Sequence, residues 1–500
     1  MAAGRISVGH QRAKRVRLKD FDFGEMEAEA EARDQPDLLL SGFIDHLGMI
    51  EEARDGRRFL FLGYKGSGKS GLAEHLALLA DQESPNGKEL FVRVLHIADL
   101  SFTNMAQMIE KGGENEARFP VAWSWLLLLQ MFDSFGEDKG ANVHEGDLWY
   151  VIDALKDAGF LPDAKLIKTV ETTLKKGAGL KLWDVINVGT EKMEKSNADV
   201  PCFVEWLKRN ARRVRSPNRH LLVVDGLDDL LRKGKQAYVA LECLLFEAKR
   251  LNNELSRNGT PAKVIVLCRT DLFDLLPGGN NNRLHQVYAV ELNWSDHPDH
   301  PKDSALVRII NRRANLGLKE EIDIFDTFLP PSLDPRDSRG DIQGHLLEHT
   351  RRIPRDMVML FKCLQKHSGS GRMTPNQVFD GLAAYSNYLV GEMADELGHH
   401  VEREQINAAI SLFKQVRKQA VSVGELEHHA KLLRYASDFE IRRILRVLFD
   451  CSLIGNGPNV KSNPRDAIFK FRDRYATFNP SQTVFFHRGL WKGLDLRAFG

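Results

Sequence analysis

Apolar runs that end at a glycine or a charged residue recur along this chain of 500 residues. Continuous apolar runs predict strands that helices cover on both faces, because such strands lack the polar alternation of half-exposed ones. Segments with helical periodicity separate these apolar runs. This alternation predicts an α/β fold built on a parallel sheet. The predicted strands cover residues 59–62, 89–98, 221–224, 263–269 and 287–292.

The first predicted strand leads into a glycine-rich loop that ends in lysine and serine at the start of a helical segment. Residues 63–70 read Gly-Tyr-Lys-Gly-Ser-Gly-Lys-Ser and match G-x-x-x-x-G-K-[ST], in the strand–loop–helix setting that the pattern requires. The glycines allow consecutive backbone N–H groups to face phosphate oxygens, and the helix adds its positive N-terminal end. An ordinary glycine-rich turn is the alternative, but both flanks favour a nucleoside triphosphate site.

This loop supplies most of the predicted nucleotide contacts. Lys69 would place its charge beside the β- and γ-phosphates, and the hydroxyl of Ser70 would be a Mg²⁺ ligand. The predicted binding residues here are Gly63, Tyr64, Lys65, Gly66, Ser67, Gly68, Lys69, Ser70 and Gly71.

An acidic residue at the tip of another buried strand would complete such a site. Asp225 follows four apolar residues, at the carboxyl end of its strand, where open α/β sheets bind ligands. It is placed to hold Mg²⁺ directly or through water. Asp228 and Asp229 come soon after it, and either could orient the attacking water or cap the next helix.

Residues 225–229, Asp-Gly-Leu-Asp-Asp, resemble the acidic motif of the STAND branch of P-loop ATPases, which includes the NACHT proteins and borders the AAA+ and origin-recognition ATPases. The resemblance implies ATP and Mg²⁺ as ligands and ATP hydrolysis as the activity. Gly226 departs from the pattern, because many ATPases carry their catalytic glutamate at that position. This departure keeps open an assembly protein that holds a nucleotide with negligible turnover.

Two further segments are similar to sensor elements of this branch. Arg269 ends the strand 263–269 and resembles an arginine placed near the γ-phosphate, although a solvated strand-end charge is the alternative. Residues 351–356 resemble the proline-containing segment of the helical lid, in which Pro354 would touch the adenine and Arg355 would be a second sensor. A proline at a helix N-terminus is also common for structural reasons.

Arg283 lies in the polar segment between the last two predicted strands, where AAA+ rings carry an arginine finger. Such an arginine, supplied in trans, accelerates phosphoryl transfer by about 10³ to 10⁵. The alternative, which we favour, is a loop arginine with a solvated side chain. The choice decides whether the chain hydrolyses ATP alone or only as a homo-oligomer.

The resemblance also divides the chain. We expect a basic arm and an acidic segment over 1–36, an ATPase core over 37–298 with a helical insertion at about 103–200, a helical lid over 299–398, and a winged helix with a C-terminal tail over 399–500. The insertion is too long for a loop and predicts a helical subdomain of its own. The acidic segment would either approach the adenine or begin a helix with a solvated acidic face.

Two basic surfaces could bind nucleic acid. The first is a run of arginines before Asp225, which would meet phosphates or an acidic partner, or else form a solvated helix face. The second is the third helix of the expected winged helix, at about 438–451, followed by a hairpin whose return strand would cover 468–472. We favour a switch role for this domain over DNA binding. The arginines are Arg209, Arg212, Arg213, Arg215 and Arg219, and Arg442, Arg443 and Arg446.

The amino-acid composition indicates the class of protein and its cellular compartment. The chain is 43% hydrophobic and 28% charged, which is typical of a soluble globular protein, and 70 basic residues balance 69 acidic ones. Five scattered cysteines without metal-ligand spacing fit a reducing cytoplasm, and the longest uncharged apolar stretch, 120–132, is too short to span a membrane.

These patterns support two functions. The first is an ATP-hydrolysing switch of the cytoplasm whose nucleotide state is sensed by a separate partner or effector protein, for instance in bacterial antiviral defence. The second is an ATP-dependent DNA-binding or loading factor of the origin-recognition type.

Overall fold

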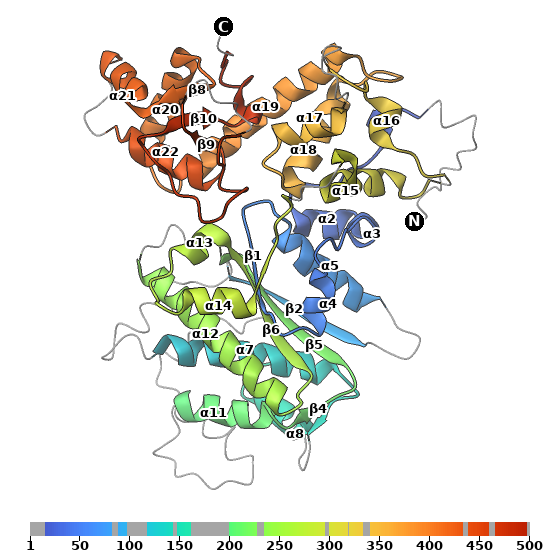
Figure 1. Cartoon of the computed structure of the whole chain (residues 1–500). Coiled ribbons are helices and arrows are strands. Elements are labelled where there is room, and N and C mark those ends of the chain that lie inside the picture. Colours follow the sequence, from blue (N-terminus) through green and yellow to red (C-terminus); the bar gives the residue numbers. More distant parts are fainter. Residues whose placement is uncertain are drawn as a thin grey trace. The chain divides into compact units, whose positions relative to one another are not determined.

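The computed structural model of the chain describes residues 16–82, 89–97, 118–143, 148–161, 200–227, 235–295, 300–318, 320–333, 341–433, 439–459 and 466–497. The chain forms two compact units (Figure 1). We name them the sheet unit, Asp45–Lys65 with Lys69–Leu292, and the helical unit, Met1–Ile44 with Gly66–Gly68 and Asn293–Gly500.

The sheet unit is built on a five-stranded parallel sheet in the order β2-β5-β6-β1-β7, so the predicted α/β fold class is confirmed. Gly63 of β1 lies opposite Arg269 of β6, and Asp225 of β5 lies opposite His96 of β2. The carboxyl ends of these strands therefore reach the same edge of the sheet. The strands are β1 Leu60–Gly63, β2 Leu90–His96, β5 Arg219–Asp225, β6 Ala262–Arg269 and β7 Ala289–Glu291.

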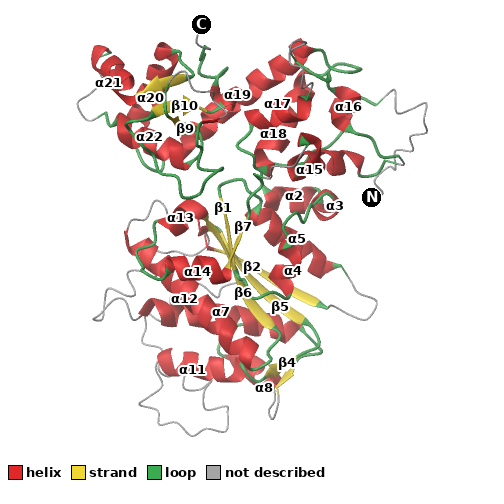
Figure 2. Cartoon of the chain, in the orientation of Figure 1, coloured by secondary structure: helices red, strands yellow, loops and turns green. Residues whose placement is uncertain are grey.

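Helices cover both faces of this sheet (Figure 2). Alternate strand residues, such as Val224 and Val266, share one core with helices α7 and α12, whereas α5 packs on the sheet from outside that core. Coverage on both faces explains why the strands read as unbroken apolar runs. The larger helices are α5 Lys69–Asp81, α7 Arg118–Glu137 and α12 Lys235–Arg257, with the shorter α4 Met49–Arg54, α13 Thr270–Asp274 and α14 Asn281–Tyr288.

The described part of the insertion shares the core of the sheet, so the prediction of a separate subdomain is wrong for these residues. The indole Nε1 of Trp123 in α7 donates to the carbonyl of Ala240 in α12 at 2.9 Å. The physical reason is the apolar surface of α7, which α11 and α12 cover together with the sheet. The other elements here are β3 Asn142–Val143, α8 Leu148–Asp157, α11 Val200–Ala211 and β4 Val214–Arg215.

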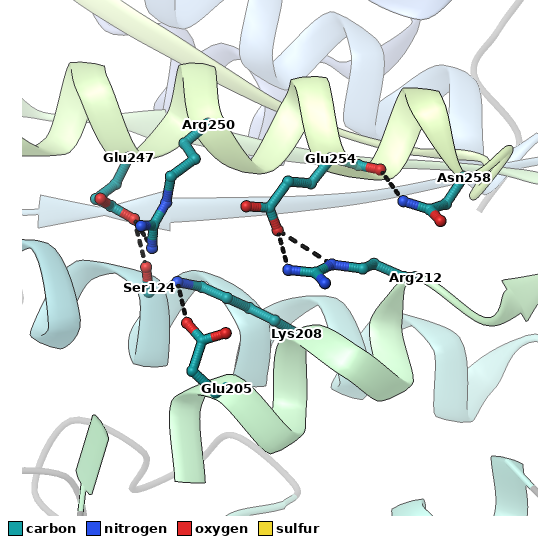
Figure 3. A network of polar contacts seen from close by, with 8 residues as sticks. All are labelled: Ser124, Glu205, Lys208, Arg212, Glu247, Arg250, Glu254 and Asn258. Carbon is teal, nitrogen blue, oxygen red and sulfur yellow. Dashed lines mark hydrogen bonds and ion pairs between the residues drawn. The ribbon is translucent and has the colours of Figure 1, made fainter. Parts of the chain in front are cut away.

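Several arginines of the predicted basic run make contacts within the sheet unit. Figure 3 shows Arg212, which follows α11, bonded to Glu254 of α12, with an N–O distance of 2.7 Å. Arg219 pairs with Asp55, and a guanidinium nitrogen of Arg215 donates to the carbonyl of Val214. These contacts give Arg212, Arg215 and Arg219 an intramolecular role, although Arg219 remains exposed.

The N-terminal segment packs on helices α15 and α18 of the helical unit. The ring of Phe23 lies 5.0 Å from that of Phe361, and Glu31 is buried against Arg313 at 2.7 Å. The acidic segment is therefore not a solvated face at Glu31. These elements are η1 Leu18–Asp20, α2 Ala28–Asp34, α3 Pro36–Ser41, η7 Pro301–Asp303, α15 Ala305–Asn315, α16 Ile324–Phe328, α17 Ile342–His349, α18 Pro354–His367 and α19 Pro375–Leu397.

The C-terminal region contains a three-stranded antiparallel sheet in the order β8-β10-β9. The predicted return strand at 468–472 is wrong, because the strand that pairs along β9 is β10, and Ile468 makes only an isolated bridge to Asn456. The described helices of the chain include none that is both long and apolar enough for a lipid bilayer. The elements are α20 Arg403–Val416, β8 Ala420–Ser422, α21 Val423–Leu432, α22 Ile441–Asp450, β9 Ile454–Gly457, β10 Thr483–Phe486 and η9 Arg488–Leu490.

Candidate functional site

The glycine-rich loop between β1 and α5 curls around the side chain of Lys69. The Nζ atom of Lys69 donates to the carbonyl of Gly63 at 2.9 Å and to that of Tyr64 at 3.1 Å, and the residue is only 8% exposed. Gly66 and Gly68 have φ angles of +82° and +95°, a conformation that other residues adopt only with strain. The loop therefore has glycine at the two positions where its backbone has a positive φ angle.

The N-terminus of α5 completes this cradle. Lys69 begins the helix and Ser70 is its second residue, so the first backbone N–H groups of α5 lack partners within the helix. The hydroxyl of Ser67 is buried and has no hydrogen-bond partner among the described residues. A buried hydroxyl left without a partner costs about 1–3 kcal/mol, and an anion in the cradle would accept its hydrogen bond. These features fit a polyphosphate.

Asp225 ends β5 at the same edge of the sheet as the glycine-rich loop, with β6 between the two strands. Its side chain is 5% exposed, and its Oδ1 accepts a hydrogen bond from the backbone N–H of Gly226 at 2.8 Å. The hydroxyl of Ser70 and this carboxylate are oxygen ligands of the kind that Mg²⁺ prefers. Both residues therefore fit the predicted magnesium site.

Gly226 has a φ angle of +78°. A glutamate at this position would be strained, at a cost of roughly 1–2 kcal/mol for a left-handed residue with a Cβ atom. The backbone conformation after β5 therefore favours glycine over glutamate at position 226. Asp228 and Asp229 lie outside the described residues.

Arg269 is buried at the end of β6, so the alternative of a solvated charge is wrong. Its guanidinium makes two bonds to the carboxylate of Asp271, at 2.9 and 2.7 Å. Since Gly63 is its register partner, Arg269 stands beside the first glycine of the loop. Arg283 is exposed and lies in the first turn of α14, between β6 and β7, rather than in a loop.

The tip of the glycine-rich loop, Gly66–Gly68, packs with the helical unit. The backbone N–H of Arg355 donates to the carbonyl of Gly66 at 3.3 Å. A Cβ atom on Gly66 would lie 3.0 Å from Ile353 and from Arg355, so close packing as well as φ favours glycine there. Within the helical unit, Arg355 and its neighbour Pro354 at the start of α18 therefore lie next to Gly66 and Gly68.

A buried ion pair holds the segment before α18, and the sequence patterns did not indicate it. Arg351 contacts Asp356 through its backbone N–H at 2.9 Å and through Nε and a terminal nitrogen at 2.9 and 2.7 Å. Burial alone would raise the pKa of Asp356, but Arg351 outweighs it and lowers that pKa. The pair fixes the turn that delivers Ile353 and Arg355 to Gly66.

A second polar cluster lies at the amino end of β5, far along the strand from Asp225. His220 contacts Asp138 at 3.0 Å and Ser134 at 2.8 Å, in the order Ser–His–Asp of a hydrolase. All three side chains are at most 3% exposed, and Asn218 also donates to Asp138. The rings of Phe91 and Phe135 pack on His220 at 4.9 and 4.8 Å. This burial makes the cluster a structural link between α7 and β5.

Replacing Asp138 with alanine should destabilise the sheet unit by about 1–3 kcal/mol, because His220 and Asn218 lose a buried acceptor. Hydrogen bonds from His220, Ser216 and Asn218 outweigh desolvation and lower the pKa of Asp138 to about 2. Its stabilising effect should therefore be complete above about pH 4 and fall as the pH drops toward 2. Urea unfolding at several pH values measures this, with Asp157→Ala on the exposed face of α8 as control. Equal midpoints for both variants at pH 7 would contradict the assignment.

No protein-family model matches the chain, and no curated protein matches it. Among solved structures, the crystal structure of Cdc6p from Pyrobaculum aerophilum is similar over 95% of this chain and 96% of its own, at 11% sequence identity and a TM-score of 0.28. A likeness this slight supports nothing about activity. A function for this chain therefore rests on the geometry of the glycine-rich loop and on the strand order.

Proposed function

We propose that this protein binds and hydrolyses ATP and acts as a molecular switch of the STAND or AAA+ type. One observation carries the proposal: a glycine-rich loop curled around Lys69 shares one sheet edge with the buried carboxylate of Asp225. A cationic cradle facing an acid across the end of a parallel sheet suits a magnesium-bound polyphosphate.

Each residue of the site has a role in this proposal. Residues 63–71 bind the phosphates, while Ser70 and Asp225 hold Mg²⁺, which would neutralise charge that develops on the phosphates. Arg269 lies next to Gly63 and is oriented by Asp271, as a sensor of the γ-phosphate would have to be. Pro354 and Arg355 report on the loop from the helical unit, through the contact between Arg355 and Gly66.

The attacking water would be oriented by Asp228 or Asp229. Asp228→Ala or Asp229→Ala should spare ATP binding and stop hydrolysis, because one of these carboxylates takes the place of the glutamate that Gly226 excludes. Phosphate release under saturating ATP measures turnover, and titration with a fluorescent ATP analogue measures binding. Normal turnover in both variants would show that another group orients the water.

The switch would act through the helical unit. The C-terminal order α20-β8-α21-α22-β9-β10 supports a winged helix, which together with the lid would present the nucleotide state to a partner protein in the cytoplasm. Bacterial defence against viruses is one setting for such a switch. The chain would then act on a separate effector.

Sizing the protein with a slowly hydrolysed ATP analogue tests whether hydrolysis needs a homo-oligomer. If Arg283 is an arginine finger, Arg283→Ala should leave ATP binding intact and lower turnover by about 10³-fold or more. Arg257→Ala, at the exposed last turn of α12, is the matched control. Monomers with and without the analogue, together with unchanged turnover, would exclude a finger in trans.

The alternative, an ATP-dependent DNA-binding or loading factor, would use the exposed face of α22. Arg442 and Arg443 there pair with Glu427 and Glu440, at 2.6 and 3.2 Å, so their charges are partly compensated within the unit. We therefore favour the switch. DNA affinity that depends on salt and is lost on changing Arg442, Arg443 and Arg446 would favour the loading factor instead.

A further inference from the structure

The helical unit contains a cavity of about 250 Å³ whose walls come from α17, the turn before α18, and the segments on both sides of β10. Its lining includes none of residues 63–71, so it is separate from the glycine-rich loop. No part of the proposed ATPase site uses it. Two chemical features, positive charge and flat aromatic surface, characterise its walls.

The walls carry an excess of positive charge. Arg352, Arg472 and Arg488 line the cavity, whereas Glu348 is the one acidic residue among the described residues of its lining and forms an ion pair with Arg488. The remaining titratable side chain, His487, is buried, and desolvation lowers its pKa to about 3, so it is neutral near pH 7. The formal charge of the lining is therefore +2, which favours an anion. Guanidinium groups bind phosphate oxygens in pairs, through parallel N–H groups.

Two of these arginines, Arg472 and Arg488, lie against aromatic rings. The guanidinium of Arg472 lies 5.6 Å from the ring of Phe469 and 5.5 Å from that of Phe471, and that of Arg488 lies 5.6 Å from Trp491. The rings of Phe469 and Phe471 are stacked, at 5.7 Å and 28°. Flat surfaces of this kind stack on a planar heteroaromatic ring, at about 1–3 kcal/mol per nucleobase.

Arg352 is held in the cavity wall by a strained backbone. Its φ angle is +54°, in the left-handed region that residues with a side chain rarely adopt. The hydroxyl of Thr350 supports this turn, since it accepts from the N–H of Arg352 at 3.3 Å and donates to the carbonyl of Leu347 at 3.0 Å. Strain that the surroundings maintain in this way is concentrated at ligand sites and switches.

We propose that this cavity binds a mononucleotide, that is, a planar base carrying a phosphate. The base would stack against the aromatic walls and the phosphate would bind Arg352 and Arg472. A cavity of this size accommodates one nucleotide, whereas inorganic phosphate would leave the aromatic walls unused. The site would be a second nucleotide site, with a regulatory rather than a hydrolytic role.

The regulatory role is inferred from the chain path and rests on the proposed ATPase function. Arg352 is the residue before Ile353, and Ile353 and Arg355 pack on Gly66 within the helical unit. The buried pair of Arg351 with Asp356 makes this turn rigid. A ligand on Arg352 would therefore bias the position of the turn against the loop and change the rate of ATP hydrolysis.

The binding experiment uses the full chain with Lys69→Ala, so that the glycine-rich loop does not contribute. Calorimetric titrations with AMP, GMP, CMP and UMP should show one site for at least one of them. Adenosine has the base without the phosphate, and inorganic phosphate lacks the base. Each should bind at least tenfold more weakly than that nucleotide. Arg472→Ala should weaken binding by about tenfold, the equivalent of about 1.4 kcal/mol, and Arg443→Ala on exposed α22 should not.

Arg472 is exposed, so its variant should fold, and an unchanged melting temperature checks this. The proposal is overturned if no monophosphate binds, if Arg472→Ala and Arg443→Ala bind alike, if inorganic phosphate binds as tightly as the nucleotide, or if an oligonucleotide such as a thymidine decamer binds more tightly. Because the loop is disabled in this background, the outcome does not depend on whether the wild-type protein hydrolyses ATP.

Discussion

Lys69→Ala should abolish detectable ATP binding. In the folded chain the ammonium group of Lys69 is held inside the loop by the carbonyls of Gly63 and Tyr64, where it would meet the β- and γ-phosphates. Alanine removes this charge from a nearly buried position and leaves the two carbonyls without their donor. We expect affinity to fall by at least about 100-fold, equivalent to about 2.8 kcal/mol. Titration with a fluorescent ATP analogue in Mg²⁺ measures this.

Lys156→Ala is the matched control, because Lys156 is an exposed lysine of the same unit, in the last turn of α8. It should bind the analogue as the wild type does. Circular dichroism of Lys69→Ala should show the same helical content as the wild type, so that loss of binding is not loss of fold. Wild-type affinity in Lys69→Ala would remove the basis for the ATPase assignment.

The sheet edge could be predicted because its strands are buried on both faces. An unbroken apolar run that ends at a glycine, an acid or an arginine identified β1, β5 and β6, and their parallel register then placed Gly63, Asp225 and Arg269 at one edge. The glycine spacing of the loop is equally local. Gly66 and Gly68 need their positive φ angles within a segment of a few residues.

The partner of β9 could not be predicted in this way. Residues 469–472 alternate apolar and polar as a strand does, yet Phe469 packs into a small core with Phe485. Ile468 bridges Asn456 on the edge of β9 that faces away from β10, whereas β10 pairs with β9 along its whole length, and tertiary packing decides this outcome. The alternating phenylalanines instead contribute to the wall of the cavity.

Ion pairs between residues far apart in the chain could not be predicted from the sequence either. Glu31 contacts Arg313 at 2.7 Å across 282 positions of the chain, and no local pattern relates the two residues. The Arg351–Asp356 pair is closer in sequence, but its importance comes from burial, which the residues between them do not reveal. Sequence patterns therefore predicted the strands and the glycine positions of the loop, but not these ion pairs.

Asp356→Ala should destabilise the helical unit by about 3–5 kcal/mol, because the buried guanidinium of Arg351 loses its close counter-charge and keeps only the more distant Glu392, at 4.0 Å. The side chain of Asp356 is fully buried and that of Arg351 is 6% exposed, so water cannot replace the lost partner. The midpoint of urea unfolding, followed by near-ultraviolet circular dichroism, measures the change. Glu427→Ala, which removes the exposed partner of Arg442, should leave the midpoint nearly unchanged.

The effect of Asp356→Ala should also depend on pH, with a sign that the geometry fixes. Arg351 lowers the pKa of Asp356 below its usual value despite burial, so the carboxylate stabilises the fold above about pH 4 and loses this effect as the pH falls toward its folded pKa. The difference between wild type and Asp356→Ala should therefore be largest near neutral pH and shrink in acid. A difference that grows on acidification would mean that Asp356 is protonated in the folded chain, and the turn before α18 would then be held by a neutral hydrogen bond.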